Sequence, residues 1–156
     1  GQFHRERPNC YANFQNLRLV GDYQSGEIHQ MSRQFYTDAD EPIVAIRRCP
    51  HVWSAQDRKR QFSPALQIEF TAGTGSQTGQ GVNPQMMLRW SNDDGQNFGN
   101  EHWAGIGRAG QTKFRAIWRR LGTYFDRVYE GRFSDPVKRD IVGATLYRNP
   151  SETGVA

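Results

Sequence analysis

Ser91, Asp93 and Gly95 are the polar residues whose types and spacing are most informative, because they follow an apolar run and precede Phe98. This Ser-x-Asp-x-Gly-x-x-aromatic spacing is typical of an Asp-box turn at the tip of a β-hairpin. Asp93 can accept hydrogen bonds from backbone N–H groups of its own turn, and Gly95 can take a positive φ at little steric cost. We expect Phe98 to return to the apolar layer beneath. The pattern therefore predicts a turn whose role is structural.

The carboxylates and histidines predict no metal site. Asp93 and Asp94 could bind calcium, but their spacing is not that of a helix-loop-helix calcium loop. Asp38, Asp40 and Glu41 form an acidic loop in which nothing nearby completes a coordination shell. The histidines are scattered without the spacing of metal ligands, at His4, His29, His51 and His102. We therefore expect neither a metal nor a cofactor.

No combination of residues predicts catalysis. A retaining glycosidase needs two carboxylates about 5 Å apart across a cleft. Glu69 and Glu130 are candidates only by elimination, since both are expected on polar strand faces. Ser91 and His102 lack the strand-to-helix turn and the orienting acid of a catalytic nucleophile. We therefore expect no catalytic residue and no enzymatic activity.

A group of basic residues could contact the phosphate backbone of DNA. The net charge of +4 and the pI near 9.3 give a mild attraction to polyanions. These residues accompany Trp90 and Trp118 in the sequence, and they are Arg89, Lys113, Arg115, Arg119 and Arg120. The alternative is a solvated or salt-bridged strand face, because charged residues usually face water. Any DNA contact would be non-specific and strongly dependent on salt.

The elements that must position these residues are strands. Residues 62–71 alternate, with Leu66, Ile68 and Phe70 on one face, which predicts a half-buried strand. Residues 113–122 fit a helix or a strand, and we predict a strand because Trp, Ile and Phe favour sheets. The whole pattern predicts an all-β fold, an antiparallel β-sandwich carrying the Asp-box-type hairpin.

The chain is expected to divide into three parts. We expect residues 1–37 to form a lead-in and a short β-hairpin similar to part of a propeller blade, with its turn at residues 24–26. We expect residues 38–149 to form the β-sandwich domain and residues 150–156 to form a disordered tail. Within the sandwich, the glycine-rich residues 72–84 lack the pattern of a phosphate-binding loop and predict a long contact-making loop. A single blade cannot bury its faces without neighbours.

The two cysteines and the hydropathy indicate whether disulfides or a membrane partner are expected. Cys10 and Cys49 are expected to be free thiols, because secreted disulfide scaffolds of this size usually carry more cysteines. No apolar run approaches the length of a membrane span, so no membrane partner is expected.

Several short motifs resemble, in order and spacing, the late part of the packaged-DNA stabilisation proteins of short-tailed bacteriophages, the tail hub or nozzle proteins. The likeness extends from about residue 14 to residue 146. The motifs include Leu19-Val20-Gly21-Asp22, Pro84-Gln85-Met86-Met87-Leu88-Arg89-Trp90-Ser91, Asn100-Glu101-His102-Trp103, Trp118-Arg119-Arg120-Leu121-Gly122 and Ser134-Asp135-Pro136.

This resemblance implies a structural virion protein that helps to retain packaged DNA by assembly and binding, without turnover. It implies the C-terminal region of a longer protein, made in the bacterial host cytoplasm and located in the virion tail. Its expected partners are other tail or portal proteins and further copies of itself. The alternative is a carbohydrate-binding or sialidase-like β module, because Asp-box hairpins also occur there. Its sugar platform would use the tryptophans, Trp53, Trp90, Trp103 and Trp118.

Overall fold

A computed structural model describes residues 5, 7–38, 41–54, 59–71, 73, 75–112 and 114–149. The described residues form fourteen β-strands and no helix, so they contain no helix that could cross a membrane. The chain divides into two compact units, Gly1–Pro42 and Ile43–Ala156. The all-β prediction is confirmed. The sequence places the domain boundary before residue 38, and that division stays a prediction, as does the tail at residues 150–156, which lies outside the described residues.

The first unit contains a three-stranded antiparallel sheet and a small strand pair. The sheet has the order β1 (Pro8–Phe14), β2 (Leu17–Asp22) and β3 (Ile28–Gln30), and β4 (Thr37–Asp38) pairs with β5 (Glu41–Pro42). The sequence predicts only two strands here. Every residue of β1 is exposed, so this strand lacks the hydrophobic alternation that marks a half-buried strand.

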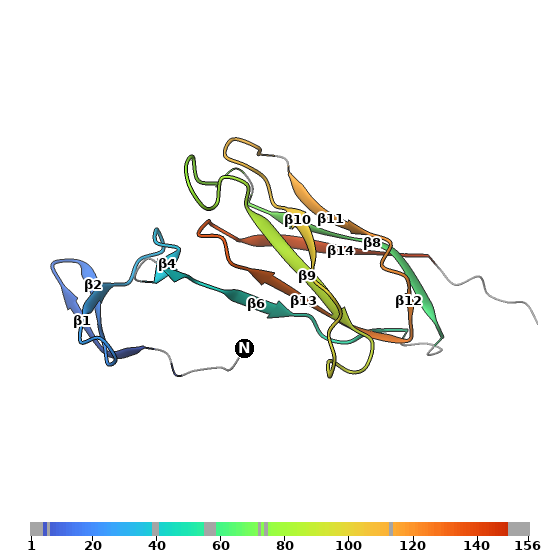
Figure 1. The fold of residues 1–156 in the computed structure, drawn as a ribbon, viewed down its shortest axis with the longest axis horizontal. Coiled ribbons are helices and arrows are strands. Elements are labelled where there is room, and N and C mark those ends of the chain that lie inside the picture. The colour runs from blue at the N-terminus through green and yellow to red at the C-terminus, as the bar shows by residue number, and fades with distance from the viewer. Residues whose placement is uncertain are drawn as a thin grey trace, which may run out of the picture. The chain divides into compact units, whose positions relative to one another are not determined.

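The second unit is a sandwich of two antiparallel sheets (Figure 1). The five-stranded sheet has the order β10 (His102–Gly105), β9 (Gln85–Ser91), β13 (Asp126–Phe133) and β6 (Ala45–Arg48), and β7 (Val52–Trp53) pairs with the start of β13. In the four-stranded sheet, β8 (Gln61–Phe70) pairs with β11 (Arg115–Arg119), β12 (Thr123–Tyr124) and β14 (Ile141–Asn149). The prediction of an antiparallel β-sandwich is confirmed.

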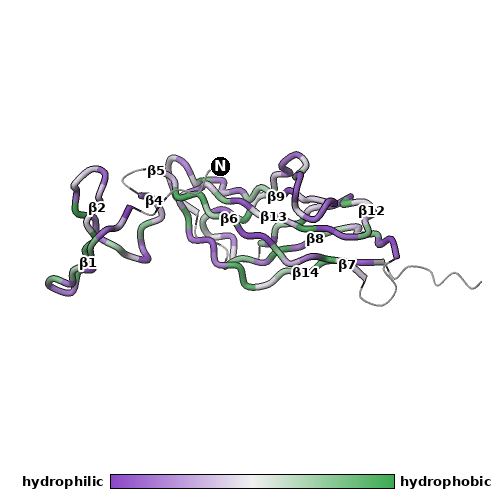
Figure 2. Tube along the Cα trace, turned by 90° about the horizontal axis from the view of Figure 1, so that it is seen from below, coloured by the Kyte–Doolittle hydropathy of each residue, from purple (hydrophilic) through white to green (hydrophobic). Residues whose placement is uncertain are grey.

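The core lies between these two sheets. Hydrophobic and hydrophilic residues alternate along the strands of this unit (Figure 2). Leu66, Ile68 and Phe70 of β8 belong to the buried cluster, as do Leu88 of β9 and Trp118 of β11. Each such side chain contributes about 1.5–3 kcal/mol when it is fully buried. The strand prediction for residues 113–122 is confirmed for Arg115–Arg119, because Ala116 and Trp118 point into the core.

Candidate functional site

The connection between β9 and β10 is a turn built on Ser91 and Asp93. The Ser91 hydroxyl accepts hydrogen bonds from the backbone N–H groups of Asp93 (3.2 Å) and Gly95 (2.9 Å) and donates to the Asp93 carboxylate. That carboxylate also accepts hydrogen bonds from the backbone N–H (2.9 Å) and the side-chain amide (2.7 Å) of Asn97. Asp94 and Gly95 take positive φ values of 59° and 81°. The assignment of this turn as an Asp-box stays a prediction.

The charge on Asp93 is part of this turn. The hydrogen bond from Ser91, followed by those from Asn97, lowers the pKa of Asp93 to about 2. The carboxylate is therefore ionised at neutral pH, and its lone pairs are used by the turn itself. Asp93 is positioned to hold the loop and not to exchange protons with a substrate.

Phe98, at the end of the turn, contacts charged side chains. Its ring is only partly buried. Two guanidinium groups lie over the ring, that of Arg89 at 4.8 Å and that of Arg48 at 5.0 Å from the ring centroid. The contacts are cation–π interactions. The expectation that Phe98 returns to the apolar layer beneath stays a prediction.

Glu130 is the counter-charge of Arg48 and Arg89. It has no exposed surface, it accepts a hydrogen bond from Arg48, and it pairs with Arg89 through Nε at 2.6 Å and Nη2 at 2.5 Å. Burial alone would raise the pKa of Glu130, but the two arginines outweigh it, so the pKa is lowered. Across the strand register Glu130 lies opposite Arg48 and Arg89, so it stands on a polar strand face as expected, although it is covered from solvent. Its oxygens are occupied, which does not suit a glycosidase acid.

The five basic residues named from the sequence do not form one group. Arg89 is tied to Glu130 in the five-stranded sheet, whereas Arg115 and Arg119 lie on the outer side of β11 in the four-stranded sheet. Arg119 lies four positions after Arg115 along the strand, a distance of roughly 13 Å. Arg120 follows with a φ of 60°. Lys113 lies outside the described residues.

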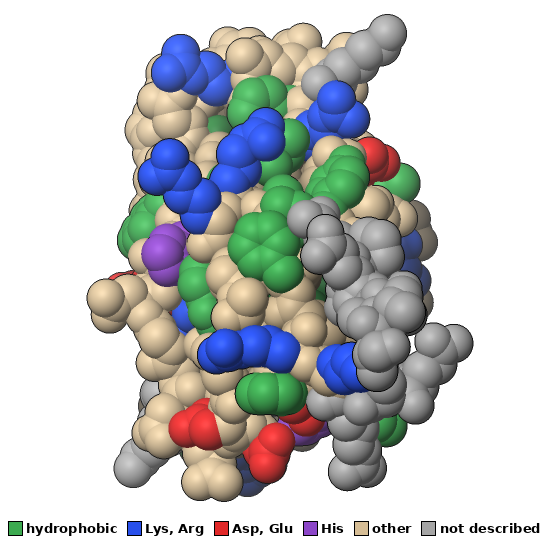
Figure 3. All heavy atoms as spheres, turned by 90° about the vertical axis from the view of Figure 1, so that its right-hand side faces the viewer, with side chains coloured by type: hydrophobic (Ala, Val, Ile, Leu, Met, Phe, Trp, Pro, Cys, Tyr) green, Lys and Arg blue, Asp and Glu red, His purple; other side chains and the backbone are tan. Residues whose placement is uncertain are grey.

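Arg115, Arg119 and Arg120 are all exposed, and in the part of the chain that the structure describes none of the three has an ion-pair partner. Figure 3 shows Lys and Arg side chains over much of one face of the molecule, most of them in its upper part, with one acidic side chain beside them and others near the lower edge. The charges of Arg115, Arg119 and Arg120 are therefore accessible to an external anion.

Three of the four tryptophans lie around one pocket. Trp90, Trp103 and Trp118 line a hollow of about 380 Å³ together with His102 and Arg119. The indole N–H of Trp118 donates to the carbonyl oxygen of His102 at 2.8 Å, and Trp90 stacks on the His102 ring at 4.6 Å. Trp53 lies on β7 at the other side of the five-stranded sheet. The structure thus brings together three members of the expected aromatic platform.

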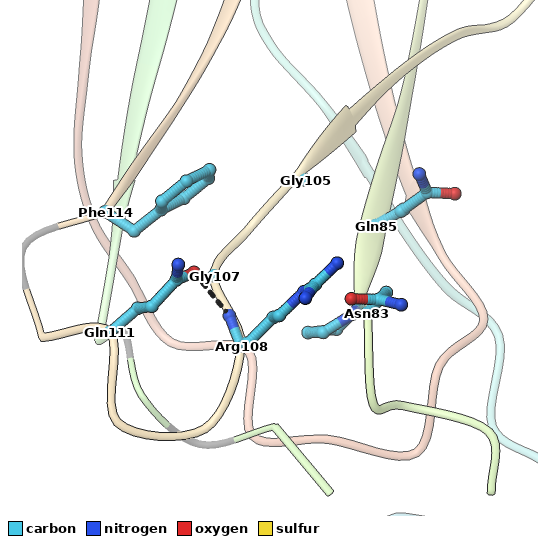
Figure 4. A pocket seen from close by; sticks show the side chains of 8 residues that line it. Asn83, Gln85, Gly105, Gly107, Arg108, Gln111 and Phe114 are labelled. Carbon is cyan, nitrogen blue, oxygen red and sulfur yellow. Dashed lines mark hydrogen bonds between the residues drawn. The ribbon is translucent and has the colours of Figure 1, made fainter.

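A second pocket, of about 500 Å³, opens beside the ends of β9 and β10 (Figure 4). It is lined by amides, glycine backbone, one arginine, one proline and one phenylalanine, namely Asn83, Pro84, Gln85, Gly105, Gly107, Arg108, Gln111 and Phe114. The side chain of Gln111 accepts a hydrogen bond from the backbone N–H of Arg108 at 2.9 Å. No carboxylate, histidine or thiol is among these described lining residues, so they offer hydrogen bonds but no general base.

An apolar cleft of about 450 Å³ lies between the two sheets and includes Cys49. The Cys49 sulfur accepts the backbone N–H of Tyr129 at 3.1 Å, and burial raises the pKa of its thiol. A buried thiol of this kind is a poor nucleophile. Cys10 and Cys49 are both free, as the sequence predicts.

Three residues able to bind a cation meet at another place. His51, Asp94 and Asp126 each offer one donor atom, and these atoms lie within 4.8 Å of one another. The sequence alone does not group them, because they are far apart in the chain and only the pairing of strands brings them together. The Asp93-Asp94 pair in the turn was the one signal in the sequence that pointed to this place.

The comparison with protein families identifies the sandwich. The family described as "Bacteriophage P22 Gp10, beta-sandwich" matches residues 52–147, which include the strands from β7 to most of β14. Comparison with curated proteins finds no match. Because the family match covers more than half of the 156 residues, the chain belongs to the bacteriophage P22 Gp10 β-sandwich family, a family of phage structural proteins.

Proposed function

We propose that this chain is a binding module of a phage tail hub, or head-to-tail connector, which helps to retain packaged DNA by assembly and without turnover. The match of residues 52–147 to the Gp10 β-sandwich carries this proposal. The ion-paired Glu130 and the pocket beside β9 and β10, whose described lining has no general base, support a role in binding. We place the protein in the virion tail, with other tail or portal proteins as its neighbours.

The exposed apolar side chains of the first unit support assembly. Ile28 is 74% exposed, Tyr11 61% and Phe14 60%, whereas Val20 is the buried hydrophobic residue of this sheet among those described. The strand register places Phe14 and Ile28 on one face of the sheet and Tyr11 on the other, and exposed apolar side chains that gather on a surface favour a protein interface. We therefore propose that further copies of the chain, or neighbouring tail proteins, cover this sheet in the virion.

Deletion of the gene from the phage that encodes this chain tests the DNA-retention role. We expect heads that package DNA and then release it, with DNA content measured per particle after purification. Complementation with the complete gene should restore retention. Heads that keep their DNA without the protein would contradict the proposal.

Light scattering over a concentration series tests self-assembly of the purified chain. We expect a defined oligomer that survives high salt, because its contacts are apolar. Replacing Ile28 by Lys places a charge in the proposed interface and should shift the equilibrium toward monomer. Replacing Val142 by Lys is the matched control, since Val142 is 70% exposed on the other unit. A monomer at all concentrations would contradict assembly through these residues.

We also propose that Arg115, Arg119 and Arg120 contact phosphates of DNA. A triple exchange to Gln should weaken DNA binding and reduce the slope of log K against log salt, by about 0.9 for each phosphate that is no longer neutralised. A control with the same change in charge exchanges three other exposed arginines, Arg18, Arg33 and Arg47. An equal weakening of binding in the two triple variants would indicate that only net charge matters.

The pocket lined by Trp90, Trp103 and Trp118 favours carbohydrate binding as a second candidate function. Trp103 is 58% exposed at this pocket, where a sugar ring could stack on it, and Arg119 could pair with a sugar carboxylate. A glycan-binding screen of the purified chain tests this function. Binding that is abolished in Trp103→Ala but kept in Trp53→Ala would support it.

A further inference from the structure

The cluster of His51, Asp94 and Asp126 joins three segments that are distant in sequence. His51 lies between β6 and β7, Asp94 in the turn after β9, and Asp126 at the start of β13. His51 Nδ1 and Asp126 Oδ2 are 2.8 Å apart, and a donor atom of Asp94 completes a group that spans at most 4.8 Å. Ligands around a tetrahedral Zn²⁺ lie about 3.4 Å from one another. The widest separation among the three donor atoms is at most 4.8 Å, so side-chain rotations could bring them around one ion.

The charges in this cluster favour a cation. Two carboxylates this close repel each other, and a divalent ion between them converts that repulsion into attraction. In the described part of the chain, neither Asp94 nor Asp126 forms an ion pair with Lys or Arg. The neighbouring Arg127 turns inward, to the carbonyl oxygen of Leu121 at 2.6 Å and the side chain of Asn92 at 2.7 Å.

Asp126 has one oxygen to spare. Its Oδ2 bonds to His51, but its Oδ1 is buried and has no hydrogen-bond partner among the described residues. A buried polar atom without a partner costs about 1–3 kcal/mol. Coordination of a cation would satisfy this carboxylate, and the ion would take the place of the hydrogen bond between His51 and Asp126.

We propose that His51, Asp94 and Asp126 form a binding site for a divalent transition-metal ion, with Zn²⁺ as the ion that fits best. One imidazole nitrogen and two carboxylate oxygens suit Zn²⁺ or Mn²⁺ better than Ca²⁺ or Mg²⁺, which prefer oxygen ligands alone. Water completes the coordination. The ion would link the β6–β7 connection, the hairpin turn and β13, and so stabilise this end of the sandwich.

Asp94 offers the cleanest test of this site. It is exposed, and within the described residues it makes no hydrogen bond. Its φ of 59° is tolerated by Asn as well as by Asp. Asp94→Asn therefore removes a charged ligand while the turn on Ser91 and Asp93 stays intact.

The experiment measures Zn²⁺ binding by calorimetry and thermal unfolding with and without Zn²⁺, on the complete chain in a Cys10→Ser background. That background is needed because the exposed thiol of Cys10 is itself a zinc ligand. We expect one ion per chain and a rise in the unfolding temperature that EDTA reverses. Asp94→Asn and His51→Ala should each weaken binding by about tenfold or more.

His29→Ala is the matched control. His29 also lies beside a carboxylate, with its Nε2 3.6 Å from Glu27, but no third ligand is near them among the described residues. Zn²⁺ affinity should not change in this variant. No binding up to millimolar Zn²⁺, or an equal decrease of affinity in His29→Ala and His51→Ala, would overturn the proposal. Unchanged affinity in Asp94→Asn would overturn it as well.

Discussion

Glu130 shows how single residues in this sandwich are committed to structure. Its carboxylate has no exposed surface and is held between Arg48 and Arg89, which themselves stack on Phe98. Removing one partner from a buried ion pair is costly because the remaining charge loses its compensation. Here the cost is moderated, since the two arginines are 55% and 32% exposed and keep contact with water.

Glu130→Gln should therefore lower the free energy of unfolding by about 2–3 kcal/mol, somewhat less than a fully buried pair. The control is Glu101→Gln, because Glu101 forms a partly exposed pair with Arg132 at 3.6 Å. That change should cost less than about 1 kcal/mol. Urea unfolding of both variants makes the measurement. Equal stability of the two variants would show that the buried network is energetically neutral.

The low pKa of Asp93 gives a prediction about pH. A carboxylate whose pKa falls from its ordinary value of 3.8 to about 2 on folding stabilises the protein at pH values above that ordinary pKa. This stabilisation is lost as the pH falls through the lower pKa of the folded protein. The stability difference between the wild type and Asp93→Asn should therefore be constant above about pH 5 and shrink between pH 4 and pH 2. Urea unfolding in buffers that contain EDTA measures it, and a pH-independent difference would contradict the assignment.

At the scale of elements, local chemistry was predictable and long-range pairing was not. The hairpin formed by β9 and β10 follows from the turn residues, and β11 follows from β-favouring residues that alternate. Strand β1 was missed because all its residues are exposed. The sites at Glu130 and at His51 could not be predicted, because β13 brings their members together by pairing with β6, β7 and β9.

Gly107, which follows β10, allows close contact with Phe114, which precedes β11. Its φ is 102°, and a Cβ there would lie 2.9 Å from Cβ of Phe114. Gly107→Ala should therefore destabilise the protein by about 1–3 kcal/mol and disturb the pocket of Figure 4. Gly143→Ala is the control, because its Cβ would meet nothing within 4 Å. Thermal unfolding compares the two, and equal midpoints would contradict a steric role for Gly107.

At the scale of the whole molecule, the two units differ in how much they bury. The sandwich holds nearly all of the buried hydrophobic residues, whereas the described sheet of the first unit contributes Val20 alone. A small sheet without a covered apolar face is marginally stable in water. The first unit should therefore gain most from assembly, since neighbours would supply the missing cover.

Hydrogen exchange at low and high protein concentration tests this difference. At concentrations where the chain is monomeric, amides of β1, β2 and β3 should exchange much faster than those of β8, β9 and β13, because local opening exposes little buried surface. In the oligomer, protection should rise in β1–β3 and stay unchanged in the sandwich. Protection in β1–β3 that equals that of β8 in the monomer would show that the sheet is stable alone. Protection gained only in the sandwich would place the assembly surface there, and the exposed residues of the first unit would then need another explanation.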